Sequence, residues 1–134
     1  MGSVVVDSSV VIGFFDPDDA HHGAAHLMLA SARQRGEHFV LAATVYTESL
    51  VGSYRHDEPT AADRRRRLLG LFGPVRVVDD AVADLAARLR ATHRWLRTPD
   101  ALVIATGIMD NAEIVTCDKR LADVDDRVKV LLSG

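Results

Sequence analysis

The chain has 134 residues, close to the usual size of one domain, and the sequence predicts a single domain over residues 1–134. The hydrophobic fraction of 48% is enough for a core, and no apolar run approaches the roughly 18 residues that cross a bilayer. A net charge of -3 argues against a globally basic nucleic-acid binder. The lone Cys117 excludes an internal disulfide, which is typical of a reducing compartment. We therefore expect a cytoplasmic protein that does not bind a membrane.

The first half of the chain alternates short apolar runs with helical patterns. Val4, Val5 and Val6 form a β-branched run without polar alternation, which is typical of a buried strand. Gly36 is expected to end the second helix. Strands are predicted at residues 3–6, 38–42 and 75–78. Helices are predicted at residues 8–15, 19–35, 44–55 and 60–71.

The second half continues the alternation. Residues 80–96 form the clearest helical pattern, because apolar residues recur at i, i+3, i+4 and i+7 from Val82. Thr98 is predicted to cap the next helix, with Pro99 at its first position and an end near residue 110. A strand, a helical turn and a last strand are predicted at 113–116, 119–122 and 128–132. This order predicts an α/β fold with a mostly parallel sheet and helices on both faces.

Four acidic residues fall where such a fold gathers side chains. Asp7 and Asp118 each follow an apolar strand, Glu48 lies in the helix after the second strand, and Asp100 opens a largely apolar helix. The carboxyl ends of parallel strands converge on one crevice, so the four carboxylates are expected to meet there. Each acid taken singly also fits a structural role, such as a helix cap for Asp7 or Asp118.

A cluster of this kind favours a metal site. Several carboxylates within a few ångströms repel one another, and some take up protons unless a cation is present. Mg²⁺ prefers oxygen ligands and keeps several of its waters. Water beside such an ion is readily activated as a nucleophile, so the pattern predicts metal-assisted hydrolysis.

The acidic residues stand in sequence contexts that resemble the PIN domain family. Val5-Val6-Asp7-Ser8-Ser9 is similar to the family's opening, and the positions of Glu48, Asp100 and Asp118 match its later acids in order. The contexts of the last two are Thr98-Pro99-Asp100-Ala101 and Thr116-Cys117-Asp118. Among PIN domains, a compact chain of this length most resembles a VapC-type toxin ribonuclease of a type II toxin–antitoxin system.

The resemblance implies a sheet in the order 3-2-1-4-5 and an endoribonuclease dependent on Mg²⁺ or Mn²⁺. It implies that the catalytic and metal-binding residues are Asp7, Glu48, Asp100 and Asp118, and that the hydroxyls of Ser8 and Thr116 support them. It also implies three partners: an RNA substrate, a second copy of the chain in a homodimer, and a VapB-type antitoxin. Hydrolysis in this family leaves a 5′-phosphate and a 3′-hydroxyl.

Other α/β classes with acidic or phosphate-binding sites do not fit. A phosphatase of the haloacid dehalogenase type needs Asp-x-Asp after its first strand, where this chain has Asp7-Ser8-Ser9. A receiver domain needs paired acids there and a Lys after its fifth strand. Neither nucleotide-binding glycine fingerprint is present. A catalytically inactive PIN-like module that binds RNA or protein stays open as the alternative.

The remaining candidates have plainer interpretations. The basic run 64–67 could contact RNA phosphates, although a solvated helix face is the more common role of such a run. His22 and His26 have the i, i+4 spacing of a zinc pair, but no further ligand is evident, so a surface role is expected. The aromatic residues, Trp95 included, are expected to be core or dimer contacts rather than platforms for bases.

Overall fold

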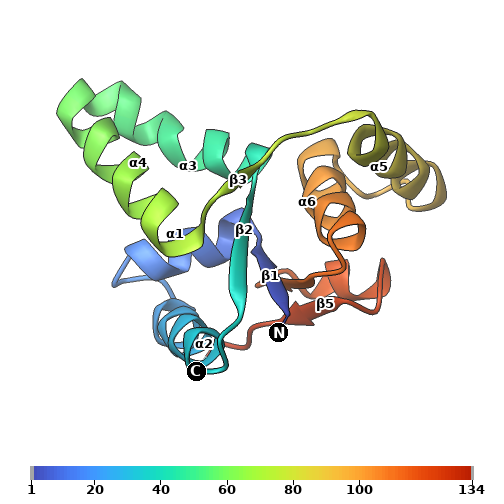
Figure 1. Cartoon of the computed structure of the whole chain (residues 1–134), viewed down its shortest axis with the longest axis horizontal. Coiled ribbons are helices and arrows are strands. Elements are labelled where there is room, and N and C mark those ends of the chain that lie inside the picture. Colours follow the sequence, from blue (N-terminus) through green and yellow to red (C-terminus); the bar gives the residue numbers. More distant parts are fainter. Residues whose placement is uncertain (1, 134) are drawn as a thin grey trace.

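The computed structural model describes residues 2–133 and has a five-stranded sheet at its centre (Figure 1). All strand pairs are parallel and the order is β3-β2-β1-β4-β5, which confirms the predicted order. The strands are β1 Ser3–Val6, β2 His38–Ala42, β3 Val75–Arg76, β4 Glu113–Thr116 and β5 Val128–Val130. The helices are α1 Ser8–Phe15, α2 His22–Gln34, α3 Ala43–His56, α4 Glu58–Phe72, α5 Asp80–Thr92, α6 Thr98–Met109 and the 3₁₀ helix η1 Lys119–Asp123.

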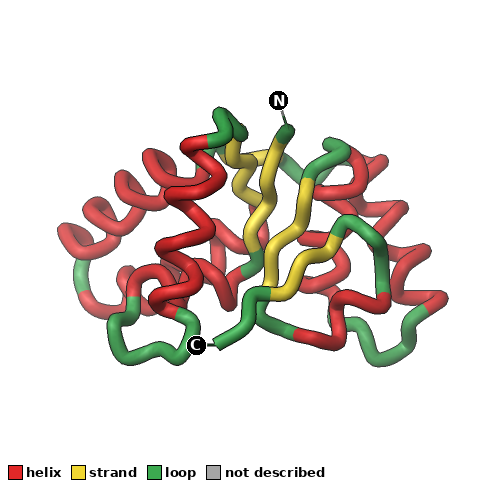
Figure 2. The backbone as a smooth tube through the Cα atoms, turned by 90° about the horizontal axis from the view of Figure 1, so that it is seen from below, coloured by secondary structure: helices red, strands yellow, loops and turns green. Residues whose placement is uncertain are grey.

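Helices cover both faces of the sheet, as predicted. Helices α5 and α6 lie on one side of the strands, whereas α1, α2 and α4 lie on the other (Figures 1 and 2). The order of the strands reverses beside β1, which pairs with β2 on one edge and with β4 on the other. A parallel sheet opens a crevice at the carboxyl ends of its strands at such a reversal point. The fold therefore places the ends of β1 and β4 side by side.

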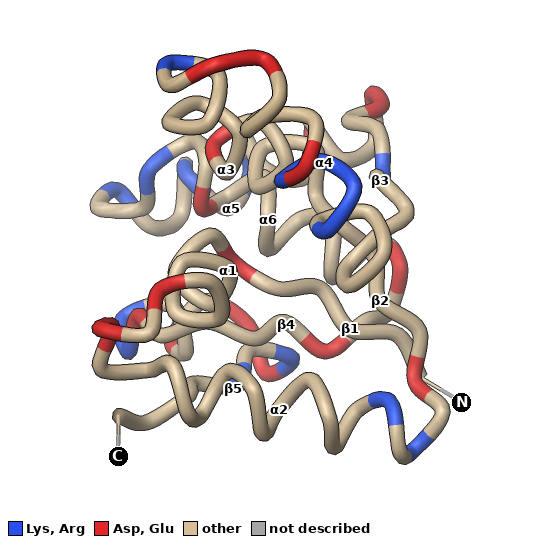
Figure 3. The backbone as a smooth tube through the Cα atoms, turned by 90° about the vertical axis from the view of Figure 1, so that its left-hand side faces the viewer, with Lys and Arg blue, Asp and Glu red and all other residues tan. Residues whose placement is uncertain are grey.

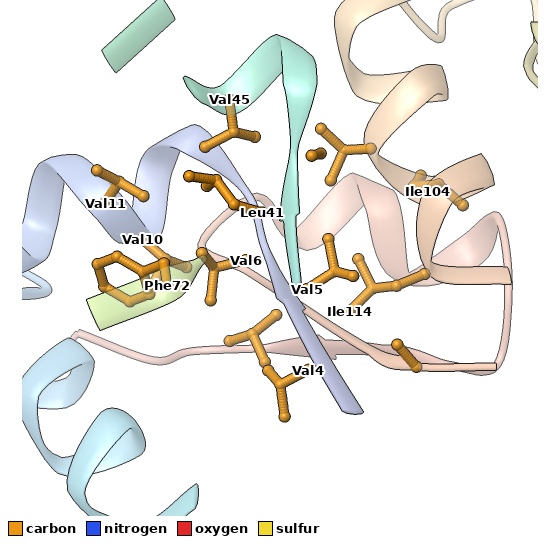
Figure 4. Close-up of a cluster of buried hydrophobic side chains, with 14 of the residues drawn as sticks. Val4, Val5, Val6, Val10, Val11, Leu41, Val45, Phe72, Ile104 and Ile114 are labelled. Atoms are coloured by element: carbon orange, nitrogen blue, oxygen red, sulfur yellow. The ribbon is translucent and has the colours of Figure 1, made fainter. Parts of the chain in front are cut away.

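The strand β1 runs through the middle of the core. Val4, Val5 and Val6 are all at most 1% exposed. Because successive side chains of a strand point to opposite faces, Val5 lies toward Ile114 and the α6 side, whereas Val6 lies toward Phe72 (Figure 4). Both faces of β1 are thus covered by apolar side chains, which explains why its sequence shows no polar alternation.

Helix α5 is shorter than the sequence pattern predicts. It ends at Thr92 instead of reaching residue 96, and residues 93–97 form a loop before α6. Leu96 is the buried anchor of this loop, at 1% exposed, and its carbonyl accepts a 2.9 Å hydrogen bond from Arg90 Nε. Thr98 is the first residue of α6 rather than its cap, so the cap position falls on Arg97.

Capping explains two other shifted boundaries. Helix α4 begins at Glu58, two residues before the predicted start, because Asp57 Oδ1 accepts a 2.7 Å hydrogen bond from the Thr60 backbone N–H. Helix α2 begins at His22, later than predicted, because Asp19 instead forms a turn with its Oδ1 accepting from the His21 N–H at 2.8 Å. Among the helices described, none combines the length and the hydrophobicity that a membrane crossing requires.

The early histidines join α2 to α1 instead of forming a zinc pair. His22 Nδ1 lies 2.8 Å from the carbonyl oxygen of Gly13, and His26 Nε2 lies 3.0 Å from that of Phe14. These carbonyls belong to the last turn of α1, where helix carbonyls lack intrahelical partners. The rings also stack against the core, since His26 and Phe14 have centroids 4.0 Å apart. A structural role accounts for both side chains.

Candidate functional site

The four predicted acids line one cavity of about 310 Å³ at the carboxyl ends of β1 and β4. Asp7 directly follows β1, and Asp118 lies two residues after β4. Glu48 comes from α3, and Asp100 comes from the first turn of α6. Ser8, Ser9, Ile12 and Arg97 complete the lining. The structure thus brings together four acids that are separated by up to 111 residues in the chain.

Asp7 is the buried centre of this cavity, with only 6% of its surface exposed. Its Oδ1 accepts a 2.8 Å hydrogen bond from the Ser8 backbone N–H. Its Oδ2 accepts two more, from Ser9 Oγ at 2.9 Å and from Thr116 Oγ1 at 2.8 Å. A buried carboxylate needs such donors, and three of them fix its orientation.

Two hydroxyls tie the ends of β1 and β4 together. Thr116 Oγ1 donates to Asp7 and accepts a 3.0 Å hydrogen bond from the Asp118 N–H. Ser9 Oγ donates to Asp7 and accepts from the Cys117 N–H at 3.0 Å. The sequence reasoning singled out Thr116 but passed over Ser9. The available signal was its place in the first turn of α1, two residues after a buried acid.

Glu48 lies at the open side of the cavity. Its side chain is exposed, and Glu48 Oε1 accepts a 2.9 Å hydrogen bond from Ser8 Oγ. Ser8 therefore serves two of the acids, with its backbone N–H on Asp7 and its hydroxyl on Glu48. This link holds α3 and α1 in register around the cavity.

Two arginines balance part of the negative charge, and the sequence reasoning named neither as a site residue. Arg97 Nε lies 3.6 Å from Asp100 Oδ2. Arg120 binds Asp118 through Nε at 3.2 Å and Nη2 at 3.0 Å. The Arg120 side-chain hydrogen bonds hold the pKa of Asp118 below its ordinary value.

The pKa of Asp100 is shifted in the opposite direction. Partial burial raises the pKa of Asp100, and the negative charge of Asp7 raises that pKa further against the opposing effect of Arg97. A carboxylate that its neighbours disfavour in the charged form is one that a bound cation would stabilise. The electrostatics of the cavity therefore favour a positive ion beside Asp100.

The donor set fits a hard divalent cation. The cavity offers carboxylate and hydroxyl oxygens and, among the residues lining it, neither histidine nor thiol, which suits Mg²⁺ or Mn²⁺ rather than Zn²⁺. Within residues 2–133, no group of three or more acidic, His or Cys side chains is already arranged to hold an ion. Asp100 and Asp118 are instead paired with Arg97 and Arg120, and both arginines are largely exposed and able to move.

The raised pKa of Asp100 predicts that Asp100→Asn stabilises the metal-free protein. The folded state binds a proton on Asp100 more readily than the unfolded chain does, so stability falls as pH rises through the interval between the two pKa values. Above that interval the loss is complete, and there the variant should melt roughly 1–4 °C above the wild type. Calorimetry in EDTA should show this difference disappearing below about pH 4. A lower melting temperature for the variant at pH 7 would contradict the electrostatic account.

The basic run on α4 is not part of the cavity. Figure 3 shows it as the blue stretch of α4, and none of its arginines is among the lining residues. The Arg64 guanidinium lies over the Phe15 ring at 4.1 Å, and that of Arg67 lies over the same ring at 4.8 Å. Half of the run thus packs on α1 as cation–π contacts.

Comparisons with known proteins agree with this geometry. The model of the family described as PIN domain matches residues 4–127. Three solved structures superpose over nearly their whole length: a toxin–antitoxin complex from Klebsiella pneumoniae, FitAcB from Neisseria gonorrhoeae, and VapC20 of Mycobacterium tuberculosis, a Sarcin-Ricin loop cleaving toxin.

The likeness to these structures is one of fold. The identities are 17%, 20% and 17%, and the TM-scores are 0.72, 0.74 and 0.69, in the same order. The alignments cover 98%, 97% and 98% of this chain, and 99%, 97% and 98% of the matched chains. No curated protein matches the sequence.

Proposed function

The chain belongs to the PIN domain family, and from this premise we propose that it is a metal-dependent endoribonuclease, the VapC-type toxin of a toxin–antitoxin pair. The observation that carries the proposal is the single cavity that Asp7, Glu48, Asp100 and Asp118 share. PIN domains are typically nucleases, and one structural neighbour is a toxin that cleaves the Sarcin-Ricin loop.

The residues of the cavity have distinct roles in the proposed reaction. Asp7, Asp100 and Asp118 would hold one or two Mg²⁺ or Mn²⁺ ions, which supply Lewis-acid stabilisation of charge on the phosphodiester and lower the pKa of water. Asp7 is fixed by three hydrogen bonds, so its carboxylate would present its oxygens to the cation in a set direction. Glu48 lies at the open side, where Ser8 orients it to take a proton from the attacking water. In-line attack at phosphorus then leaves a 5′-phosphate and a 3′-hydroxyl.

The alternative of a catalytically inactive binding module is less well supported. Such a module would have no use for a costly cluster of carboxylates, one of them buried and bonded by three donors. All four acids are present in this chain, and the cavity beside them is open. The chemistry of the pocket therefore favours an enzyme.

A protein partner is supported by the surface of α3. Beside the acidic cavity, this helix carries an apolar hollow of about 530 Å³ lined by Tyr46, Thr47, Leu50, Val51, Tyr54 and Arg55. Val51 and Tyr54 are 41% and 46% exposed, and exposed apolar patches commonly mark protein-binding sites. Four structural neighbours come from toxin–antitoxin complexes or VapBC or FitAcB structures. We propose an antitoxin of the VapB type as the partner, and a homodimer as the state of the toxin.

The function predicts that purified protein cleaves RNA only with a divalent cation. Cleavage of total RNA should proceed in Mg²⁺ or Mn²⁺, stop in excess EDTA, and resume when the cation is restored. The new ends should carry 5′-phosphates, which permit adapter ligation without kinase treatment. Equal cleavage in EDTA would point to a metal-free mechanism through the 2′-hydroxyl and would reject the proposal. Purification without the antitoxin is essential, because a bound partner would mask the activity.

A further inference from the structure

The loop 93–97 and the helix η1 bring an aromatic ring and two arginines to the mouth of the acidic cavity. Arg97 and Arg120 pair with Asp100 and Asp118, and the Arg120 guanidinium also lies over the ring of Trp95 at 5.5 Å. We call Trp95, Arg97 and Arg120 the rim. They come from two segments that are separated in the chain by α6 and β4.

The rim is exposed, although the loop that carries Trp95 and Arg97 is anchored by a buried residue. Trp95 is 42% exposed, and the side chains of Arg97 and Arg120 are 78% and 68% exposed. The neighbouring Leu96 is buried and bonded to Arg90, so the loop is held while its large aromatic ring faces water. Of the two roles expected for Trp95 from the sequence, its exposure excludes the core, and a contact between copies of the chain stays a prediction.

Arg120 has two possible partners of the same chemical kind. It now forms a bidentate contact with the Asp118 carboxylate, and the guanidinium fork matches a phosphate equally well. A cation that takes up Asp118 would release Arg120 at the point where the substrate's phosphates enter. The exposed side chain needs no rearrangement of the backbone for this exchange.

We propose that the rim binds single-stranded RNA, with one base stacked on Trp95 and the adjoining phosphates held by Arg97 and Arg120. This inference rests on the proposed function and names the form of its substrate. Bases in a duplex have both faces covered by neighbouring pairs, whereas bases of loops and single strands stack readily on aromatic side chains. Arg120 leaves Asp118 for a phosphate when RNA and cation bind, which links occupation of the metal site to binding of the strand.

Trp95 is the only tryptophan of the chain, so its fluorescence reports on the rim directly. Titration with a mixed-sequence single-stranded RNA of 10 nucleotides should quench this fluorescence in Ca²⁺, which also prefers oxygen ligands, and the RNA should bind more weakly in EDTA, where Arg120 stays on Asp118. The same strand annealed to its complement should bind at least 10-fold more weakly. Inorganic polyphosphate, which carries the charge without the bases, should compete for the site but cause little quenching.

Variants separate stacking from charge. Trp95→Ala should weaken binding of a labelled RNA, followed by anisotropy, about 5- to 150-fold, and Trp95→Phe should recover much of the loss. Arg120→Ala should lower the slope of log affinity against log salt by about 0.7. Arg88→Ala, on the exposed face of α5, should change neither affinity nor slope. Arg120→Ala should also bind Mn²⁺ several-fold more tightly in EPR titrations without RNA, because Asp118 loses its competing cation.

Several outcomes would overturn the proposal for the rim. Undiminished RNA affinity in Trp95→Ala, equal binding of duplex and single strand, or unchanged Mn²⁺ affinity in Arg120→Ala would each contradict it. A fall in the sedimentation mass of Trp95→Ala with unaltered RNA affinity would make Trp95 a contact between copies. If the wild type cleaves RNA and Trp95→Ala cleaves it at the same rate, the proposal for the rim is rejected and the proposed function stands. If the wild type cleaves no RNA in Mg²⁺ or Mn²⁺, the proposed function fails, whatever the fluorescence shows.

Discussion

Asp7→Asn should reduce RNA cleavage in Mg²⁺ by about 1,000-fold or more while the protein stays folded. The side chain keeps its shape, and its amide oxygen can still accept from the Ser8 N–H. What is lost is the negative charge at the most buried acid of the cavity. Metal ions supply several kcal/mol of charge stabilisation in such reactions, and each 1.36 kcal/mol corresponds to about a factor of ten in rate.

The measurement is single-turnover cleavage of a fixed RNA, together with the melting temperature of each variant. Asp123→Asn is the matched control, because Asp123 is an exposed acid at the end of η1 and lies outside the cavity. Its cleavage rate should equal that of the wild type. Equal rates for Asp7→Asn and the wild type, with and without Mg²⁺, would instead favour the inactive binding module.

The second large effect concerns the packing that delivers Asp100 to the cavity. Gly107 lies on α6 where this helix approaches β4, and a Cβ at position 107 would come closer than 3.0 Å to Cγ1 and Cδ1 of Ile114. Ile114 is fully buried and has little room to move. Gly107→Ala should therefore lower the free energy of unfolding by about 1–3 kcal/mol, the usual result of overpacking a core.

Chemical denaturation can separate this clash from the effect of helix propensity. Gly52→Ala on α3 is the matched control, because a Cβ there meets nothing within 4 Å. It should be neutral or stabilising by up to about 1 kcal/mol. Adding Ile114→Ala to Gly107→Ala should cost less than the sum of the single changes, because it removes the atoms that clash. A double variant with an additive loss would show that the contact is not the cause.

The sequence alone predicted the arrangement of elements, which the structure confirms, and pointed to the four acids that the structure brings into one cavity. The run of valines in β1 marks a strand covered on both faces, and the apolar spacing from Val82 marks an amphipathic helix. These are local signals, because each depends on which neighbouring residues a short segment must bury. Asp7 and Asp118 could then be placed at the ends of adjacent strands from the order of the elements and the family resemblance.

Only the tertiary structure showed which hydrogen bonds orient the acids of the cavity and which arginines balance their charge. The bond from Thr116 to Asp7 joins residues 109 positions apart, and the Cys117 N–H reaches Ser9 Oγ across 108 positions. Arg120 pairs locally with Asp118 but also lies over the ring of Trp95. The end of α5 also depends on tertiary contacts. The helical pattern of the sequence continues to residue 96, but the helix ends at Thr92 and the chain forms a loop that buries Leu96. Local periodicity carries no information about contacts made across the fold, such as the hydroxyl bonds that join the ends of β1 and β4 and the approach of Arg120 to Trp95.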